Sequence, residues 1–397
     1  VSWLSYGKLR ASYAEVGHSA PAYYVYDTYA LGTPIAGNPV ASASSTKRDP
    51  FLRPERNRGY EFGMEASFLQ SRLGFDITYY HSQAFDQITP VSISSASGYT
   101  TKILNAGTIQ NAGVELSINA TPVKTRDFSW DFTVNWTRNR NKVVALFDTA
   151  KNLQIASFQG GVSLNAALGE PYGTLRGGDF VYTADGSRTV KSNGYYQISS
   201  TSNNVIGNAN PDWTGSFANT FRYKNFALNF LIDVRQGGDI FSLDMYYGLA
   251  TGLYPETAGK NDLGNPVRNT IADGGGIINK GETADGKENT KRVDISGLFG
   301  AYGYYRNPAK AFVYDASFVK LREVGLTYSF PKTFLGKSPV FKGVDVSVIG
   351  RNLWIIHKNL PYSDPEDIIS SGNAAVGFQG GAYPAVRTFA FNVKLRF

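Results

Sequence analysis

The sequence lacks cysteine entirely and contains only three histidines among its 397 residues. Without cysteine the chain forms no disulfide bonds and no thiolate metal sites, which suits an exported protein that does not depend on covalent links. His18, His81 and His357 lie in separate segments with no metal-ligand spacing, and no Ser/His/acid cluster accompanies them. We therefore expect no catalytic residues, no metal site and no cofactor, and predict that the protein is not an enzyme.

Long apolar runs are also missing. No segment of about 18 consecutive apolar residues occurs, which excludes a membrane-spanning helix. A membrane-spanning β-barrel stays open, because each of its strands gives a much weaker signal. Long basic runs are missing too, although the net charge is +7. Nucleic acid is one explanation of this charge. We favour Lys and Arg in a polar lumen and in loops near anionic outer-membrane lipid, and expect no nucleic-acid partner.

Aromatic residues are plentiful instead, with 25 Tyr and 25 Phe. They gather in segments where apolar and polar residues alternate, and the last segment is the clearest. Its apolar side chains occupy every second position: Phe389, Phe391, Val393, Leu395 and Phe397. A period of two is typical of a β-strand with one apolar and one wet face. An aromatic at the carboxyl terminus suits a strand that closes a cylinder in a bilayer.

The same alternation predicts strands along the rest of the chain. Several exceed the five or six residues usual in soluble proteins and approach the length needed to cross a bilayer. In Phe312–Phe330 the apolar phase slips between Leu321 and Val324, which predicts a β-bulge. Thr174–Thr183 and Tyr195–Ser199 are weaker candidates. The clear strands are 8–16, 60–68, 73–80, 114–121, 128–137, 213–223, 226–234, 312–330, 344–348 and 385–397.

Short and long connections alternate between these strands, as in a barrel with short turns on one side and long loops on the other. We therefore predict an all-β fold, a transmembrane antiparallel β-barrel with about 10–12 strands in this chain. The 147–212 segment contributes either none of these strands or two. The short connections are 69–72, 122–127, 224–225 and 331–342, and the long ones are 17–55, 83–104, 147–212, 237–310 and 353–383.

Several motifs resemble the carboxyl-terminal half of the SusC/RagA class of TonB-dependent outer-membrane transporters, and they cover nearly the whole chain. Their order and spacing are more specific than any one motif. They are Gly113-Val114-Glu115-Leu116 through Asn141-Lys142-Val143-Val144, Ile206-Gly207-Asn208-Ala209-Asn210-Pro211-Asp212-Trp213 through Arg235-Gln236-Gly237-Gly238-Asp239, Asp315-Ala316-Ser317-Phe318-Val319-Lys320-Leu321-Arg322, Leu326-Thr327-Tyr328-Ser329-Phe330-Pro331, Gly350-Arg351-Asn352-Leu353-Trp354, Asp364-Pro365-Glu366 and the final strand.

The resemblance implies a 22-stranded barrel of which residues 1–397 are the carboxyl-terminal portion, with a plug domain and a TonB-contacting segment before it. It implies import of oligosaccharides or peptides across the outer membrane of a Gram-negative bacterium, powered by the TonB complex and assisted by a SusD-like surface lipoprotein. Phe397 resembles the assembly signal read by the barrel-assembly machinery.

Two stretches depart from the family pattern. Arg53-Pro54-Glu55-Arg56 stands where relatives often have Asn-Pro-x-Leu-Lys-x-Glu. Thr183-Ala184-Asp185-Gly186 lacks the fuller acidic pattern of relatives, which counts against a calcium site there. The acidic group Asp364, Glu366 and Asp367 is either a cation site or, as we favour, a solvated loop. Gly274-Gly275-Gly276 lacks the residues of a phosphate loop and indicates loop flexibility.

The longest loop supplies the candidate binding residues. Flat aromatic rings stack on sugars and pack on peptides, and the tyrosine hydroxyl adds a polar group. The alternatives are packing within the loop and contact with the lipoprotein. The candidate substrate-binding residues are Tyr246, Tyr247, Tyr254, Tyr302, Tyr304 and Tyr305. A second group of aromatics near strand ends is expected in the membrane-interface girdles: Tyr60, Tyr79, Trp136, Tyr223 and Tyr328.

Two other classes of function stay open. One is a stand-alone outer-membrane barrel that acts as a passive pore or adhesin. The other is a soluble, extracellular β-rich binding protein or enzyme, against which the long strands and the terminal Phe397 count.

Overall fold

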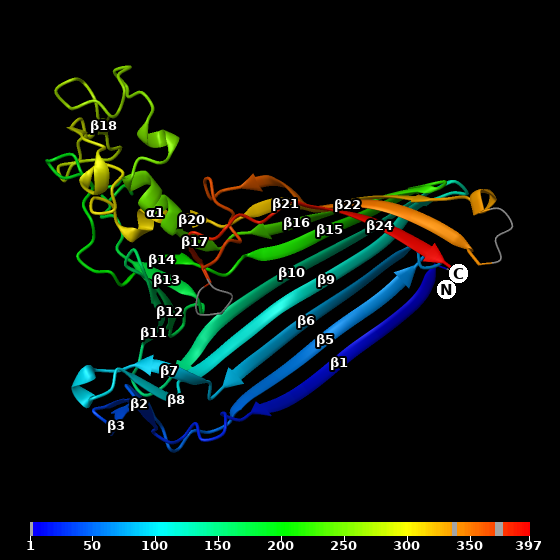
Figure 1. The fold of residues 1–397 in the computed structure, drawn as a ribbon, viewed down its shortest axis with the longest axis horizontal. Coiled ribbons are helices and arrows are strands. Elements are labelled where there is room, and N and C mark those ends of the chain that lie inside the picture. Colours follow the sequence, from blue (N-terminus) through cyan, green and yellow to red (C-terminus); the bar gives the residue numbers. More distant parts are fainter. Residues whose placement is uncertain (1–2, 336–339, 370–375) are drawn as a thin grey trace.

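A computed structural model describes residues 3–335, 340–369 and 376–397 of the chain. A single large sheet of ten strands dominates it, and its strands run diagonally across Figure 1. The strands contain from 9 to 19 residues. In sheet order they are β1 (Leu4–His18), β5 (Glu55–Phe68), β6 (Leu73–Phe85), β9 (Gly107–Lys124), β10 (Phe128–Leu146), β15 (Trp213–Tyr223), β16 (Phe226–Gln236), β21 (Phe318–Ser329), β22 (Gly343–Lys358) and β24 (Thr388–Arg396).

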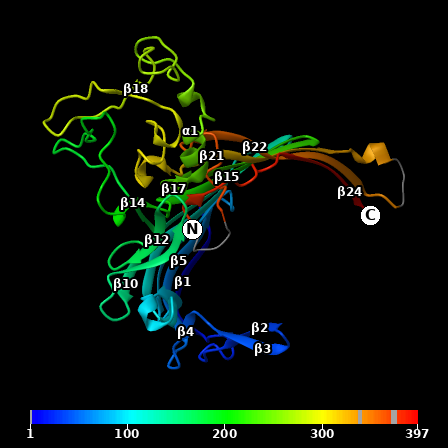
Figure 2. The ribbon, with the colours of Figure 1, turned by 60° about the vertical axis from the view of Figure 1, so that its left-hand side comes forward.

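Every neighbouring pair in this sheet is antiparallel, and the sheet is curved, as the two views of Figures 1 and 2 show. The predicted antiparallel sheet, which we call the wall, is thus confirmed, and it contains ten strands among the residues that the structure describes. The small sheet in 147–212 does not join the wall, so that segment adds no strands to it. β1 and β24 are the two edges, and no pairing between them is found in the described parts of the chain.

One face of the wall carries a row of apolar side chains that crosses every strand. The register sets Leu9 beside Met64, Met64 beside Ile77, Ile77 beside Leu116 and Leu116 beside Trp136. Because side chains alternate along each strand, the neighbouring positions all point to the other face. An apolar outer band and a polar interior are the arrangement of a membrane barrel. On the later strands the same apolar face is continued by Phe217, Ile232, Leu321, Val348 and Phe391.

The opposite face is polar and held together by charged pairs between strands. Arg10 of β1 reaches over β5 and donates to Asp76 of β6 at 2.8 Å. Arg351 of β22 donates to Glu323 of β21 at 2.9 Å. These pairs belong to the interior of a barrel, because a lipid-facing charge would be left without water.

The predicted β-bulge lies in β21. Leu321 pairs with Ile232, whereas Glu323 pairs with the adjacent Leu231, so Arg322 is an extra residue on its strand. The shift explains why the apolar phase slips between Leu321 and Val324. Arg322 lies on the polar face, where its guanidinium donates to Asp233 at 2.7 Å.

The long loops fold together at one end of the wall, and short turns lie at the other end (Figure 1). Their strands are β2 (Tyr29–Ile35), β3 (Asn38–Ala43), β4 (Thr46–Arg48), β7 (Ile88–Ser92), β8 (Thr101–Asn105), β11 (Asn152–Phe158), β12 (Val162–Ala167), β13 (Thr174–Gly177), β14 (Asn204–Asn208), β17 (Asp239–Ser242), β18 (Ile277–Ile278), β19 (Arg292–Val293), β20 (Val313–Asp315) and β23 (Phe378–Gln379). The helices are α1 (Leu243–Ala250) and 3-10 turns at Ser95–Ser97, Pro255–Thr257, Gly297–Phe299, Ala309–Phe312 and Lys332–Leu335.

Some boundaries differ from the prediction. The 237–310 segment was expected to be loop, yet it contains α1. Thr174–Thr183 forms a strand only over Thr174–Gly177, and Tyr195–Ser199 makes isolated bridges rather than a strand. β22 continues to Lys358, past the expected start of a loop at residue 353.

Among the described residues, none of the helices has the length and apolar character needed to cross a membrane.

The main apolar core lies under the loops rather than in the wall. Phe241, Phe312 and Phe378 are almost completely buried and come from three separate loop elements. The rings of Phe241 and Phe378 stack with centroids 5.2 Å apart. Burial of such side chains stabilises by about 1.5–3 kcal/mol each, so the loops form an ordered layer.

The two faces of β15 give a direct test of the wall's orientation. Phe217 and Ser216 are adjacent, and their side chains point to the apolar and the polar face. We expect Phe217→Arg to destabilise the folded barrel by about 2–4 kcal/mol, the cost of Arg near the middle of a bilayer. Ser216→Arg should cost much less. Denaturant titration of protein folded into lipid vesicles measures both, and equal costs would contradict the assignment of the faces.

Candidate ligand and partner surface on the loop side

The start of helix α1 joins two long loops, 237–310 and 353–383. Ser242 caps the helix by accepting from the Met245 amide at 3.2 Å, and its hydroxyl donates to Gln379 at 2.6 Å. Asp244 in the first turn accepts from Ser363 at 2.7 Å and also from Gln379. A carboxylate at a helix N-terminus is favourable for the helix as well. α1 is therefore fixed in place by residues far away in the sequence.

Helix α1 presents an aromatic cluster formed with residues near 300. The rings of Tyr246 and Tyr304 are parallel within 8°, with centroids 4.4 Å apart. Tyr247 meets both rings edge-on, and its hydroxyl accepts a hydrogen bond from Gln159. Burial raises the pKa of Tyr246 to about 12, so its hydroxyl stays protonated at neutral pH.

The exposed rim of this cluster is formed by two further rings. Tyr305 lies 4.9 Å from Tyr304 and stacks on Phe299 with centroids 4.7 Å apart. Tyr305 is 57% exposed and Phe299 61% exposed. We call Tyr246, Tyr247, Phe299, Tyr304 and Tyr305 the aromatic ledge. Its inner rings hold the outer two in a fixed position, where they offer flat faces to a ligand or a partner.

The other two candidate tyrosines lie apart from the ledge. Tyr254 stacks on Tyr362, with centroids 4.3 Å apart, and the Tyr362 hydroxyl donates to Glu256 at 2.9 Å. Tyr302 packs against a separate core cluster that contains Val293. The structure thus brings together four of the six candidates, pairs Tyr254 with a tyrosine from another loop, and leaves Tyr302 in a packing role.

Sequence reasoning missed Phe299, Tyr362 and Asp244. Phe299 lies in the same aromatic-rich stretch as Tyr302, so the composition that identified Tyr302 could also have identified Phe299. Tyr362 and Asp244 gain their roles only through contacts between residues more than 100 positions apart.

Two of the three acidic side chains of the 353–383 loop, Asp364 and Glu366, contact the wall. Lys320 of β21 is only 5% exposed and forms ion pairs with Asp364 and Glu366. Arg322, the extra residue of the bulge, donates to Glu366 at 2.6 Å and to Asp233. The carboxylates are therefore already neutralised by protein cations. We call these five residues the loop latch.

Burial acts to raise the pKa of Glu366, but the hydrogen bonds and charges of Arg322 and Lys320 outweigh it and hold the pKa below its ordinary value. Asp367 has the opposite shift, because burial and the nearby Asp364 charge raise its pKa. No group of three metal-ligating side chains is found within the ranges that the structure describes.

The stretch at 183–186, which lacks the acidic pattern of relatives, forms a tight turn. Asp185 accepts hydrogen bonds from Thr183 and Ser187, which lower its pKa to about 2. The same four residue types recur at Thr283-Ala284-Asp285-Gly286, where the Asp285 side chain accepts from Thr283 at 2.6 Å. Both aspartate carboxylates accept hydrogen bonds from residues of their own turns. The repeat of Thr-Ala-Asp-Gly was visible in the sequence and was missed.

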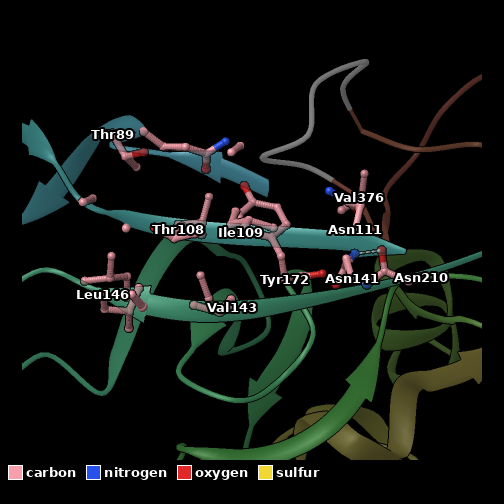
Figure 3. A pocket seen from close by; sticks show the side chains of 18 residues that line it. Thr89, Thr108, Ile109, Asn111, Asn141, Val143, Leu146, Tyr172, Asn210 and Val376 are labelled. Carbon is pink, nitrogen blue, oxygen red and sulfur yellow. Dashed lines mark hydrogen bonds between the residues drawn. The ribbon is translucent and has the colours of Figure 1, made fainter. Parts of the chain in front are cut away.

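A cavity of about 360 Å³ lies between the loop-side ends of β9 and β10 and the loops above them (Figure 3). Its lining is half apolar, with Val143 and Leu146, and half neutral amide and hydroxyl. Asn141 donates to Asn210 at 2.9 Å, while the Asn141 Oδ1 atom is buried with no hydrogen-bond partner among the described residues. The space suits water or a small neutral ligand.

The remaining predicted residues do not converge on a site. His81 lies on the apolar face, where it stacks on Tyr60 with ring centroids 4.9 Å apart, as expected. Phe397 is 68% exposed, with its ring 5.3 Å from that of Phe341. Its role in assembly stays a prediction.

Removing the charge of Lys320 should weaken the attachment of the 353–383 loop to the wall. In Lys320→Met the Asp364 carboxylate loses its buried partner, which costs about 3–5 kcal/mol. Arg351→Met is the matched control, because Arg351 is 63% exposed and its pair with Glu323 is worth about 0–1 kcal/mol. Hydrogen exchange of amides 359–369 measures the effect. Unchanged protection in the Lys320 variant would show that the latch does not hold the loop.

Acid should loosen the same loop. A depressed pKa means that Glu366 stabilises the fold above its ordinary value of 4.5, and that this contribution is lost as the pH falls through the lower folded value. Exchange protection of amides 359–369, corrected for intrinsic rates, should therefore drop below pH 4.5. If protection rises in acid instead, the charge network is not what orders the loop.

Comparisons with known proteins agree with this geometry. A family model described as "TonB dependent receptor-like, beta-barrel" matches residues 1–195. TonB-dependent receptor P3 of Formosa agariphila is 27% identical, with 98% of this chain and 39% of the relative covered. TonB-dependent receptor SusC of Bacteroides thetaiotaomicron is 24% identical, with 95% and 35% covered. The chain thus spans less than half the length of these curated relatives.

A solved structure has the same fold. The structure titled "Structure of the RagAB peptide transporter" superposes with a TM-score of 0.72 at 20% identity, covering 100% of this chain and 41% of that chain. This likeness supports the fold alone. Taken with the sequence matches, the chain is similar over nearly its whole length to TonB-dependent receptors, SusC among them, and its sheet has the fold of part of an outer-membrane β-barrel.

Proposed function

We propose that this chain is the loop-bearing barrel half of an active importer that takes up oligosaccharides or peptides together with a SusD-like surface lipoprotein. The observation that carries the proposal is the aromatic ledge on an ordered loop layer, latched to the polar face of the wall. The similarity to SusC and to the RagAB peptide transporter supports this class of cargo and partner.

The proposed barrel is larger than this chain. The edge strands β1 and β24 expose unpaired backbone and apolar side chains, such as Leu9 at 82% and Phe391 at 80%. Backbone groups in a bilayer must be paired, so each edge requires a neighbouring strand. We propose that further strands of the same protein meet both edges, to a total of 22, with a plug domain inside the ring.

The ledge is proposed to meet the ligand or the lipoprotein. Tyr305 and Phe299 stack on each other and face solvent, whereas the stacked rings of Tyr246 and Tyr304 form the inner part of the ledge. Stacked, half-exposed rings recognise a sugar face or an apolar peptide side chain without a change in shape. Displacement of the plug by the TonB complex would then open the lumen. The chain itself performs no covalent chemistry in this scheme.

A passive pore or adhesin is the second candidate. A sheet of ten strands is within the range of stand-alone barrels. The unpaired edges of the curved sheet favour the larger barrel. Dependence on TonB separates the two functions, since a passive pore works without it.

Loop deletion tests the importer. In the full-length protein, replacing 243–305 by a short Gly/Ser linker should abolish uptake by growing cells of the glycan or peptide that they use through this gene. The barrel should still assemble, as judged by heat-modifiable migration. Deleting the β2–β3 hairpin is the control, because that hairpin lies far from α1 in both Figures 1 and 2.

A second variant guards against a folding defect. Phe299→Ala/Tyr305→Ala leaves the core side chains intact and should reduce uptake by on the order of tenfold, since each lost aromatic contact is worth about 0.5–1.5 kcal/mol. Uptake should also stop in cells without TonB. Undiminished uptake in the loop-deletion strain would sink the importer proposal, and TonB-independent uptake would favour the pore.

A further inference from the structure

Strand β10 carries a change of chemistry on its membrane-facing side that transport does not explain. Its outward positions are apolar or aromatic from Phe128 to Trp136. The next three outward positions are basic: Arg138, Arg140 and Lys142. The inward neighbours Asn139 and Asn141 are not part of this row, because they point into the loop-side interior and hydrogen-bond there.

The length of the strand places the basic row at the membrane surface. An outer-membrane barrel has an apolar band about 25 Å tall and strands tilted by about 35–45°, so about ten residues cross the hydrocarbon. Phe128 to Thr137 is such a segment, and its last outward-facing side chain is the aromatic Trp136. Arg138 then lies at the boundary, and Arg140 and Lys142 lie beyond it. β10 continues into the long 147–212 loop, so this boundary is the outer one.

Only part of the positive charge of this basic row is balanced by acidic side chains of the protein. Arg140 forms an ion pair with Asp212 at 2.8 Å, in which both side chains are about half exposed. No ion pair to Arg138 or Lys142 is found among the residues that the structure describes. Their cross-strand neighbours on β9 are the neutral Val114 and Gln110. Three cations on alternate residues of one strand repel each other, and an anion beside them relieves that repulsion.

Other basic residues on the same face are already paired. Arg56 and Arg58 of β5 contact Glu15, and Arg56 also contacts Asp86. The row on β10 therefore differs from its surroundings in its net charge. On the same face, Tyr79 of β6 lies in the cross-strand row of Arg138, with Val114 of β9 between them, and an aromatic ring in this position suits the border of the membrane zone.

We infer that Arg138, Arg140 and Lys142 bind the phosphate headgroup of an outer-leaflet lipid. Guanidinium groups bind phosphate in a bidentate manner, and lysine adds a point charge. A lipid places its phosphate at this depth while its acyl chains lie along Phe132, Val134 and Trp136 of the same strand. Free phosphate has the charge but no acyl chains to use this adjacent apolar face, so the two sources are distinguishable.

Lipid binding to the full-length protein in detergent, read by native mass spectrometry, tests the proposal. The probe is diphosphoryl lipid A. Arg138→Gln/Lys142→Gln should weaken binding about 30-fold, since each basic residue near an anionic surface contributes about 1 kcal/mol, or about fivefold in affinity. Lys124→Gln/Arg126→Gln is the matched control, because it removes the same charge at the short-turn end of the same hairpin and should leave binding unchanged.

Two further arms use the unaltered protein, so a folding defect in a variant does not spoil the test. Dephosphorylated lipid A should bind at least about tenfold more weakly than the phosphorylated lipid. Millimolar inorganic phosphate should not displace the lipid. Equal binding of both lipids, or equal loss in both double variants, would overturn the proposal. Displacement by inorganic phosphate alone would assign the row to a solution anion.

Discussion

The constraint on which this structure depends is that every backbone amide and carbonyl in a bilayer must be hydrogen-bonded. Long antiparallel strands meet it through their ladders, and alternation then separates an apolar face from a polar one. The rows that run from Leu9 through Ile77 to Trp136 are a consequence of that geometry. So are the charged pairs inside, such as Arg10 with Asp76, which have no place on the lipid side. The same constraint makes the two unpaired edges the strongest support for a larger ring.

The wall in turn fixes the loops that carry the proposed function. The bulge at Arg322 adds one cation to the polar face, next to Lys320. Together they hold Glu366, and the same loop reaches Asp244 at the start of α1. The aromatic ledge is therefore connected to the barrel through a continuous set of polar contacts. Rigid positioning of exposed rings lowers the conformational entropy that binding would otherwise cost.

Much of the wall was predictable from the sequence, because a period of two is a local signal and its slip near Leu321 marks the bulge. The helix α1 was not predicted, since its eight residues are too few for a helical periodicity to stand out. The loop latch could not be predicted from the sequence, because Lys320 and Glu366 are 46 residues apart and meet only after the wall has formed. The tyrosines of the longest loop were found by composition, but which of them are stacked and which exposed depends on tertiary contacts.

The central claim is that the curved sheet is one part of a larger outer-membrane barrel. A cryo-electron microscopy map of the full-length protein purified from outer membranes tests it most directly. The account predicts that β1 and β24 each pair with a strand outside this chain, and that the row from Leu9 to Trp136 faces the detergent. A map in which β1 pairs with β24 to close a ten-stranded barrel would contradict it.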